Sequence, residues 1–270
     1  MNTLGAERRH WPEYLIEAVL LGLFMLSACG FSLLLEHPAS PVPVWLPEPA
    51  ARRLAAGIAM AFTAVSLIYS PWGQRSGAHM NPAMTLVFFR LGKIESRDAL
   101  FYALAQFVGA VLGVFVASAL FGAELAHSSV RYAVTLPGEY GPAAAFGAEL
   151  VISFALAAAV LRSANDSRTR EWTGVCAAVL IALYITFEAP FSGMSMNPAR
   201  TLGSALFAGR FDGIWVYFVA PPLGMLLAAE LHVRAGRKRE VFCAKLQHGG
   251  DSCIFRCRYD ELLNGKGERQ

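Results

Sequence analysis

The chain has 270 residues, of which 55% are hydrophobic and 16% are charged. Soluble domains usually carry about 25% charged residues, so the composition argues against an ordinary soluble domain. The formal net charge of +3 reflects membrane topology rather than nucleic-acid binding, and we expect no nucleic-acid partner.

Six long runs with few charges predict six membrane-spanning helices. Three are long enough to span a bilayer unaided, and three become so if Glu149, Glu188 or Glu230 is tolerated within or beside the span. The sequence therefore predicts an all-α membrane protein. The runs are Ala18–Leu35, Leu54–Gly73, Ala99–Ala123, Leu150–Leu161, Thr173–Phe187 and Gly213–Ala229.

Most of the 23 Lys and Arg residues, including all those from Arg234 to Arg269, fall on the side of the membrane that holds both termini. Positive residues favour the cytoplasmic side. We therefore expect an integral protein of the plasma (inner) membrane with both termini in the cytoplasm. The first run shows no small-residue cleavage site, so we expect no removable signal peptide.

The chain divides into five predicted segments. A basic cytoplasmic N-terminus, 1–13, leads into a first repeat, 14–122; a connecting outer loop, 123–141, leads into a second repeat, 142–234; a cytoplasmic tail, 235–270, contains three cysteines. The proline-rich outer loop Glu36–Pro49 is expected to be extended and stiff, either shaping the outer mouth or only connecting two spans. Gly109, Gly113 and nearby alanines in the third span predict close helix packing.

Two short stretches dominate the sequence. Ser76–Leu86 and Ser192–Leu202 share eight of eleven residues at an offset of 116. Each contains an Asn that suits a helix N-cap, followed by a Pro that suits the first helical position. Each predicted helix covers about 15 Å, roughly half of a bilayer core. Half-helices at matched places in two repeats predict a solute site at the membrane midplane.

From about Tyr14 to Arg234, the sequence resembles the major intrinsic protein family, the aquaporins and aquaglyceroporins. The resemblance is carried by Arg200 and by the paired Asn-Pro-Ala motifs Asn81-Pro82-Ala83 and Asn197-Pro198-Ala199. It implies an inverted repeat of six spans plus two re-entrant half-helices, assembled as a homotetramer in lipid with one pore per subunit. Facing helix N-termini and two Asn amide groups would hold a solute oxygen and oppose protons and cations.

Arg200 is the strongest candidate for selectivity. A cation in the first turn of a helix opposes the dipole, and burial at membrane depth costs about 2.5–3.5 kcal/mol on insertion scales. The resemblance assigns it to a narrow outer constriction with Ile185 and Met194. Counting back from Asn81 adds Ala61, or Phe62 if the alignment shifts by one residue.

The rest of this constriction leaves the solute open. Orthodox water channels carry His where Ile185 stands, and glycerol facilitators carry Asp where Thr201 stands. Ala61 with Ile185 is more similar to nodulin-26-like metalloid and boric acid channels, which have a small residue in place of Met194. A flexible Met could narrow the pore back toward the size of water.

Three buried or pore-facing groups need a role. Glu17 and Glu149 lie at matched places in the spans, where a bare carboxylate is costly. The resemblance implies that they accept hydrogen bonds from the re-entrant loops, and we favour this bracing role over a proton relay. His79 is expected to line the pore or brace its loop, with pH sensing as the alternative.

The tail holds Cys243, His248, Cys253 and Cys257. Four soft ligands would suffice for zinc, but their spacing fits no standard finger, so we expect reduced thiols without a metal.

The sequence as a whole predicts a passive channel for water and small neutral solutes, with no cofactor. The alternatives are a metalloid, boric acid, glycerol or urea channel of the same fold, and a non-conducting membrane protein with a metal-binding tail. No nucleotide-binding loop, nucleophile triad or pair of catalytic acids stands out, so we expect no enzyme.

Overall fold

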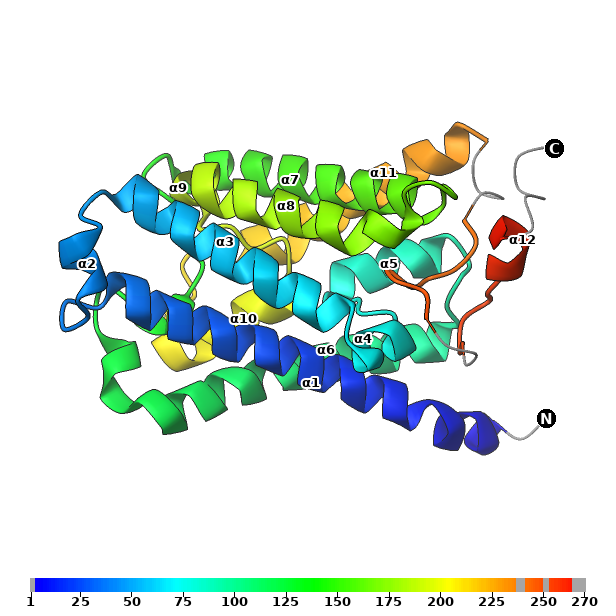
Figure 1. Ribbon diagram of the computed structural model, residues 1–270, viewed down its shortest axis with the longest axis horizontal. Helices are drawn as coiled ribbons and strands as arrows, with labels where there is room; N and C mark the ends of the chain where they lie inside the picture. Colours follow the sequence, from blue (N-terminus) through cyan, green and yellow to red (C-terminus); the bar gives the residue numbers. More distant parts are fainter. Residues whose placement is uncertain (1–2, 237–240, 250–252, 264–270) are drawn as a thin grey trace.

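The computed structural model describes residues 3–236, 241–249 and 253–263, which form helices joined by loops (Figure 1). Within these ranges, six helices are long and apolar enough to cross a membrane, which confirms the predicted fold class. They are α1 (Thr3–Glu36), α3 (Pro49–Ile68), α6 (Ser96–Phe121), α7 (Gly141–Ala164), α8 (Thr173–Phe187) and α11 (Ile214–Arg234).

Shorter helices fill the connections. Two of them, α5 (Pro82–Arg90) and α10 (Pro198–Ala208), are the predicted half-helices. The others are α2 (Val42–Trp45), α4 (Pro71–Ser76), η1 (Gly122–Ala126), η2 (Arg131–Ala133), η3 (Arg170–Trp172), α9 (Ala189–Ser192) and α12 (Tyr259–Leu263). Two details differ from expectation: the N-terminal segment is already helical from Thr3, and the outer loop contains the helical turn α2.

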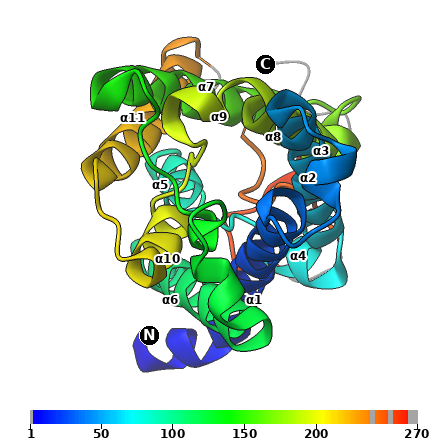
Figure 2. The same ribbon diagram turned by 90° about the vertical axis from the view of Figure 1, so that its left-hand side faces the viewer.

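The two half-helices lie between α6 and α11 in the ring of helices (Figure 2). Helix α5 lies in the half of the molecule that holds both chain termini, and α10 lies in the opposite half (Figure 1). We call the terminus-bearing end the inner end and the opposite end the outer end.

Asparagine side chains start both half-helices. The Oδ1 atom of Asn81 accepts a hydrogen bond from the Ala83 N–H at 2.9 Å, and that of Asn197 accepts from the Ala199 N–H at 3.1 Å. In each case the proline that follows occupies the first helical position, where its missing N–H is not needed. The caps therefore form as the Asn-Pro pairs predict.

Glycines bring the paired spans close together. A Cβ atom on Gly109 of α6 would lie 2.1 Å from the carbonyl oxygen of Ala18 in α1, and one on Gly224 of α11 would lie 2.3 Å from that of Leu150 in α7. Side chains at these positions would collide with backbone, so the α1–α6 and α7–α11 contacts depend on glycine. The expectation of close packing along the third span is confirmed.

The outward faces of the spans are apolar. On α6, five large apolar side chains spaced three or four residues apart are each more than half exposed, as expected of a helix face that meets lipid. Together with the six spans, this face identifies an integral membrane protein. The five residues are Leu100, Leu104, Val108, Leu112 and Phe115.

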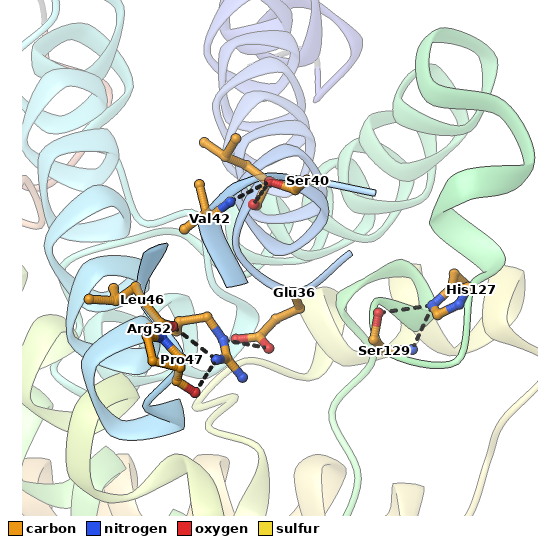
Figure 3. A network of polar contacts seen from close by, with 9 residues as sticks. Glu36, Ser40, Val42, Leu46, Pro47, Arg52, His127 and Ser129 are labelled. Carbon is orange, nitrogen blue, oxygen red and sulfur yellow. Dashed lines mark hydrogen bonds and ion pairs between the residues drawn. The ribbon is translucent and has the colours of Figure 1, made fainter. Parts of the chain in front are cut away.

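Polar contacts order the loop at the outer end (Figure 3). Arg52 donates from Nε to a Glu36 carboxylate oxygen at 3.1 Å and from Nη1 to the carbonyl oxygens of Leu46 and Pro47 at 3.1 and 2.7 Å. One arginine therefore ties the outer end of α1 to both the loop and α3.

Candidate functional site

The two half-helices meet at their N-termini inside the molecule. The Asn81 amide nitrogen donates to the carbonyl oxygen of Met196, and the Asn197 amide nitrogen donates to that of Met80, both at 2.7 Å. An amide nitrogen carries two hydrogens, so one on each Asn remains for a solute. Both side chains line an internal cavity, which puts this second donor where a solute would pass.

The loop before each half-helix has an unusual backbone. Ala78 and Met80 in the first loop, and Met194 and Met196 in the second, have φ between +46° and +56°. Such left-handed residues without glycine cost about 1–3 kcal/mol each and persist only where the surroundings fix them. All four line the cavity, so the strained segments form its walls.

Glu17 fixes the first loop from α1. It is fully buried, and its carboxylate accepts from the N–H groups of His79 and Met80 at 3.0 and 2.7 Å. The Ser76 hydroxyl and the Gln106 amide donate to it at 2.8 Å each.

Glu149 does the same for the second loop from α7. Its fully buried carboxylate accepts from the N–H groups of Ser195 and Met196, both at 2.7 Å, and from the Ser192 hydroxyl at 2.8 Å. Neither glutamate is among the residues that line the cavity. These contacts favour the bracing role that the sequence suggested over a proton relay.

The cavity has a volume of about 320 Å³ and extends along the bundle. Glu36 and Ser129 border it at the outer end, the two Asn side chains lie along it, and Leu246 of the tail borders it at the inner end. The lining is mostly apolar and comes from both repeats, with few polar side chains to hold a solute. Such a lining suits small uncharged molecules better than ions.

Three of the four predicted constriction residues line this cavity: Ile185, Met194 and Arg200. Ala61 does not line the cavity, and neither does Phe62, whose side chain is 68% exposed. Helix α3 instead contributes Ala56, Met60, Ala64 and Ile68. The prediction of Ala61 counts twenty residues back from Asn81, across the loop that contains α4. An error of one residue in this count moves the chosen position by about 100° around α3, to a different face of the helix.

Arg200 follows the cap of α10 and brings its charge to the cavity. Its Nη1 atom is buried and has no hydrogen-bond partner among the described residues. A buried donor without a partner costs about 1–3 kcal/mol, more when charged, so this atom favours a polar molecule beside it.

Comparison with known proteins agrees with this geometry. The sequence profile of a family described as "Major intrinsic protein" matches residues 6–232.

The chain belongs to the major intrinsic protein family.

Several plant members of the family are similar in sequence. The chain is 32% identical over 215 residues to "Aquaporin NIP1-1" of Arabidopsis thaliana, covering 78% of this chain and 70% of that protein. It is 37% identical over 164 residues to "Aquaporin NIP1-3" of Oryza sativa subsp. japonica, covering 60% of this chain and 55% of that protein. The match thus spans about half the length of the rice relative.

A solved structure of the family shares the fold. The "X-ray structure of the aquaglyceroporin from Plasmodium falciparum" superposes with a TM-score of 0.68 at 18% sequence identity. The superposition covers 86% of this chain and 98% of that one. The family is one of membrane channels, in agreement with the prediction that the chain is not an enzyme.

In this major intrinsic protein, His79 connects the cavity to the tail. Its ring nitrogens lie 3.0 Å from the Thr85 hydroxyl and 2.6 Å from the Ala244 carbonyl oxygen. Its ring also stacks between those of Phe88 and Phe255. These contacts favour the bracing role, and they extend it from the loop to the tail.

The tail brings its Cys and His residues together, which their spacing did not suggest. One ligand atom from each of Cys243, His248, Cys253 and Cys257 lies within 4.8 Å of all the others. Hydrogen bonds from the Cys243 and Cys253 thiols lower the pKa of Cys257 well below that of an ordinary thiol. Burial lowers the pKa of the neighbouring Lys93. We call these four residues the Cys–His cluster.

Proposed function

We propose that this protein is a passive channel for water and small neutral solutes, with one pore per subunit. The observation that carries the proposal is the cavity shared by the two Asn side chains and Arg200. Two helix N-termini and one arginine give this part of the cavity a positive potential, which opposes protons and cations. The apolar remainder of the lining offers no replacement for the hydration shell of an ion.

Of the four α3 residues that line the cavity, we assign Met60 to the outer constriction, together with Ile185, Met194 and Arg200. Two methionines and one isoleucine leave Arg200 as the polar side chain of this set, so a solute would bind through hydrogen bonds from the guanidinium. Methionine side chains are unbranched and adaptable, so the opening can adjust to solutes of somewhat different size. This composition supports passage of neutral solutes such as boric acid, glycerol or urea beside water.

Topology and assembly are part of the proposal. The excess of Lys and Arg at the inner end supports a cytoplasmic location for both termini in the plasma (inner) membrane. The two repeats, 14–122 and 142–234, would build the pore, and Glu17 and Glu149 would brace its loops. Resemblance to the family supports a homotetramer.

Stopped-flow light scattering of proteoliposomes tests the proposal. A sucrose gradient should produce shrinkage much faster than in empty vesicles, and gradients of glycerol, urea and boric acid should show which solutes then drive reswelling. An Asn81→Asp, Asn197→Asp double variant provides the control, because it keeps the side-chain size but adds charge at the midplane. Permeability equal to that of empty vesicles, both with added Zn²⁺ and with a metal chelator, would refute the channel.

A further inference from the structure

The tail folds back over the inner end of the cavity. The Leu246 N–H donates to the Gly77 carbonyl oxygen at 3.1 Å, and Leu246 itself lines the cavity. Two residues earlier, the Ala244 carbonyl oxygen accepts from His79 at 2.6 Å. Ala244 and Leu246 are buried, and Figure 1 shows this orange to red segment at the inner end beside α4 and α5. The backbone of the tail therefore lies across the inner mouth.

Further contacts attach the same segment to the body of the channel. The Phe242 N–H donates to the Asn165 side chain at 2.8 Å, and the Arg256 N–H donates to the Lys93 carbonyl oxygen at 2.9 Å. The Arg256 guanidinium also pairs with Glu95 at 2.6 Å. The described part of the tail is thus attached at Phe242 to the end of α7 and at Arg256 to the loop between α5 and α6.

The Cys–His cluster has the composition of a zinc site. Three thiols and one imidazole are a common ligand set for structural zinc, which is tetrahedral with Zn–S of about 2.3 Å and Zn–N of about 2.0–2.1 Å. Those bond lengths place two sulfurs about 3.8 Å apart and a sulfur and a nitrogen about 3.6 Å apart. The Sγ atoms of Cys243 and Cys253 are 3.5 Å apart, and His248 Nε2 is 3.2 Å from Cys257 Sγ.

The surroundings of the cluster suit a bound metal. The His248 ring is stacked on Tyr259 with centroids 3.9 Å apart and planes 5° apart, which fixes its orientation. Three thiolates and one Zn²⁺ carry a net negative charge, and the buried Lys93 lies close enough to Cys243 and Cys257 to interact with them electrostatically. The pair of sulfurs at 3.5 Å is not bonded, and all three cysteines are free.

Residues of the cluster alternate along the chain with those that cover the mouth. Cys243 and His248 enclose Ala244 and Leu246, whereas Cys253 and Cys257 enclose Phe255, the residue stacked on His79. Closing the cluster around one ion would therefore hold both covering segments, 243–248 and 253–257, in place together. Ala244, Leu246 and Phe255 also pack into the apolar core of the channel, so an ion bound by the cluster would add to these contacts.

We propose that Cys243, His248, Cys253 and Cys257 bind one zinc ion, and that zinc binding holds the tail across the inner mouth and closes the channel. Loss of the ion frees the covering segments and opens the cavity to the inner solution. Metal binding does not depend on the proposed channel activity, whereas the closing effect rests on it.

The first test measures the metal alone. Full-length protein, purified with a reductant and loaded with Zn²⁺, should retain one zinc per chain after desalting, and Co²⁺ in its place should show thiolate charge-transfer and tetrahedral d–d bands. Cys253→Ser and His248→Ala should lose the metal. Cys176→Ser, which changes a cysteine in α8 far along the chain from the cluster, should retain it. No tightly held metal in the native chain would overturn the site.

The second test measures gating in proteoliposomes. Water permeability with Zn²⁺ on both sides should be about fivefold or more below that with a chelator, in the range of ordinary allosteric couplings. Cys253→Ser should be permeable in both conditions. Leu246→Ala should still bind one zinc but be closed less completely.

Three other results would contradict the gate. Equal permeability with zinc and with chelator, or equal inhibition of native protein and Cys253→Ser, would overturn the gate. A native protein that binds zinc but stays impermeable in chelator would overturn both the gate and the proposed channel, and leave the metal site standing.

Discussion

Replacing Glu149 by Gln tests whether the buried carboxylates hold the pore loops. In the native protein, this carboxylate accepts three hydrogen bonds, from Ser192, Ser195 and Met196. A Gln side chain retains one acceptor oxygen and turns its NH₂ group toward at least one of these donors. One charge-assisted bond is then lost, and two donors face each other.

The expected loss follows from these contacts. Hydrogen bonds to charged groups contribute about 1.5–3 kcal/mol, and a buried donor left without an acceptor costs about 1–3 kcal/mol. Because the neutral amide retains the other bonds in weaker form, we expect Glu149→Gln to lower the free energy of unfolding by about 2–4 kcal/mol. The strained backbone at Met194 and Met196 should relax, and water permeability per folded protein should fall.

Unfolding in detergent, followed by intrinsic fluorescence, measures the stability change. Glu230→Gln is the matched control: that carboxylate pairs with Arg90 and Arg234 at the surface, and its loss should change little. Unchanged stability in Glu149→Gln would refute the bracing role. A proton flux in the native protein that Glu149→Gln abolishes would favour a proton relay instead.

Three further substitutions test other parts of the structure. Gly109→Val should destabilise the protein by about 1–3 kcal/mol or more, because its side chain collides with the Ala18 carbonyl; thermal unfolding measures this, with Gly147→Ala, where nothing lies within 4 Å, as the control. Arg200→Val should admit protons, so a pH-sensitive dye inside vesicles should respond to a pH gradient faster than with native protein. Met194→Ala should raise the ratio of boric acid to water permeability, and an unchanged ratio would place the constriction elsewhere.

The half-helices could be predicted from the sequence because their signals are local. Asn81 and Asn197 cap the turns that immediately follow them, and the prolines fix the first residue of each helix. The first half-helix ends at Arg90, as expected where a charged residue follows an apolar run. The six spans were predictable for the same reason, since length and apolar composition determine whether a helix can cross lipid.

The side of α3 that lines the cavity and the fold of the tail were not predictable in this way. The face of α3 that lines the cavity carries Ala56, Met60, Ala64 and Ile68 and not Ala61, because the turn of α4 sets the register between α3 and Asn81. No periodicity within α3 reveals that register. The Cys–His cluster forms because the tail is folded against the channel. Leu246 and Phe255 contact the loop at Gly77 and His79, far away in sequence. Spacing alone contains no information about such contacts.

The crossed hydrogen bonds between the Asn residues have a consequence for biogenesis. Asn81 holds the carbonyl of Met196, and Asn197 holds that of Met80, so each half of the chain completes the loop of the other. During synthesis, the first loop has no such partner until more than one hundred further residues have been made and inserted. The first loop therefore cannot be completed before the second is in place, and two separately expressed halves should become resistant to protease only when they are made together.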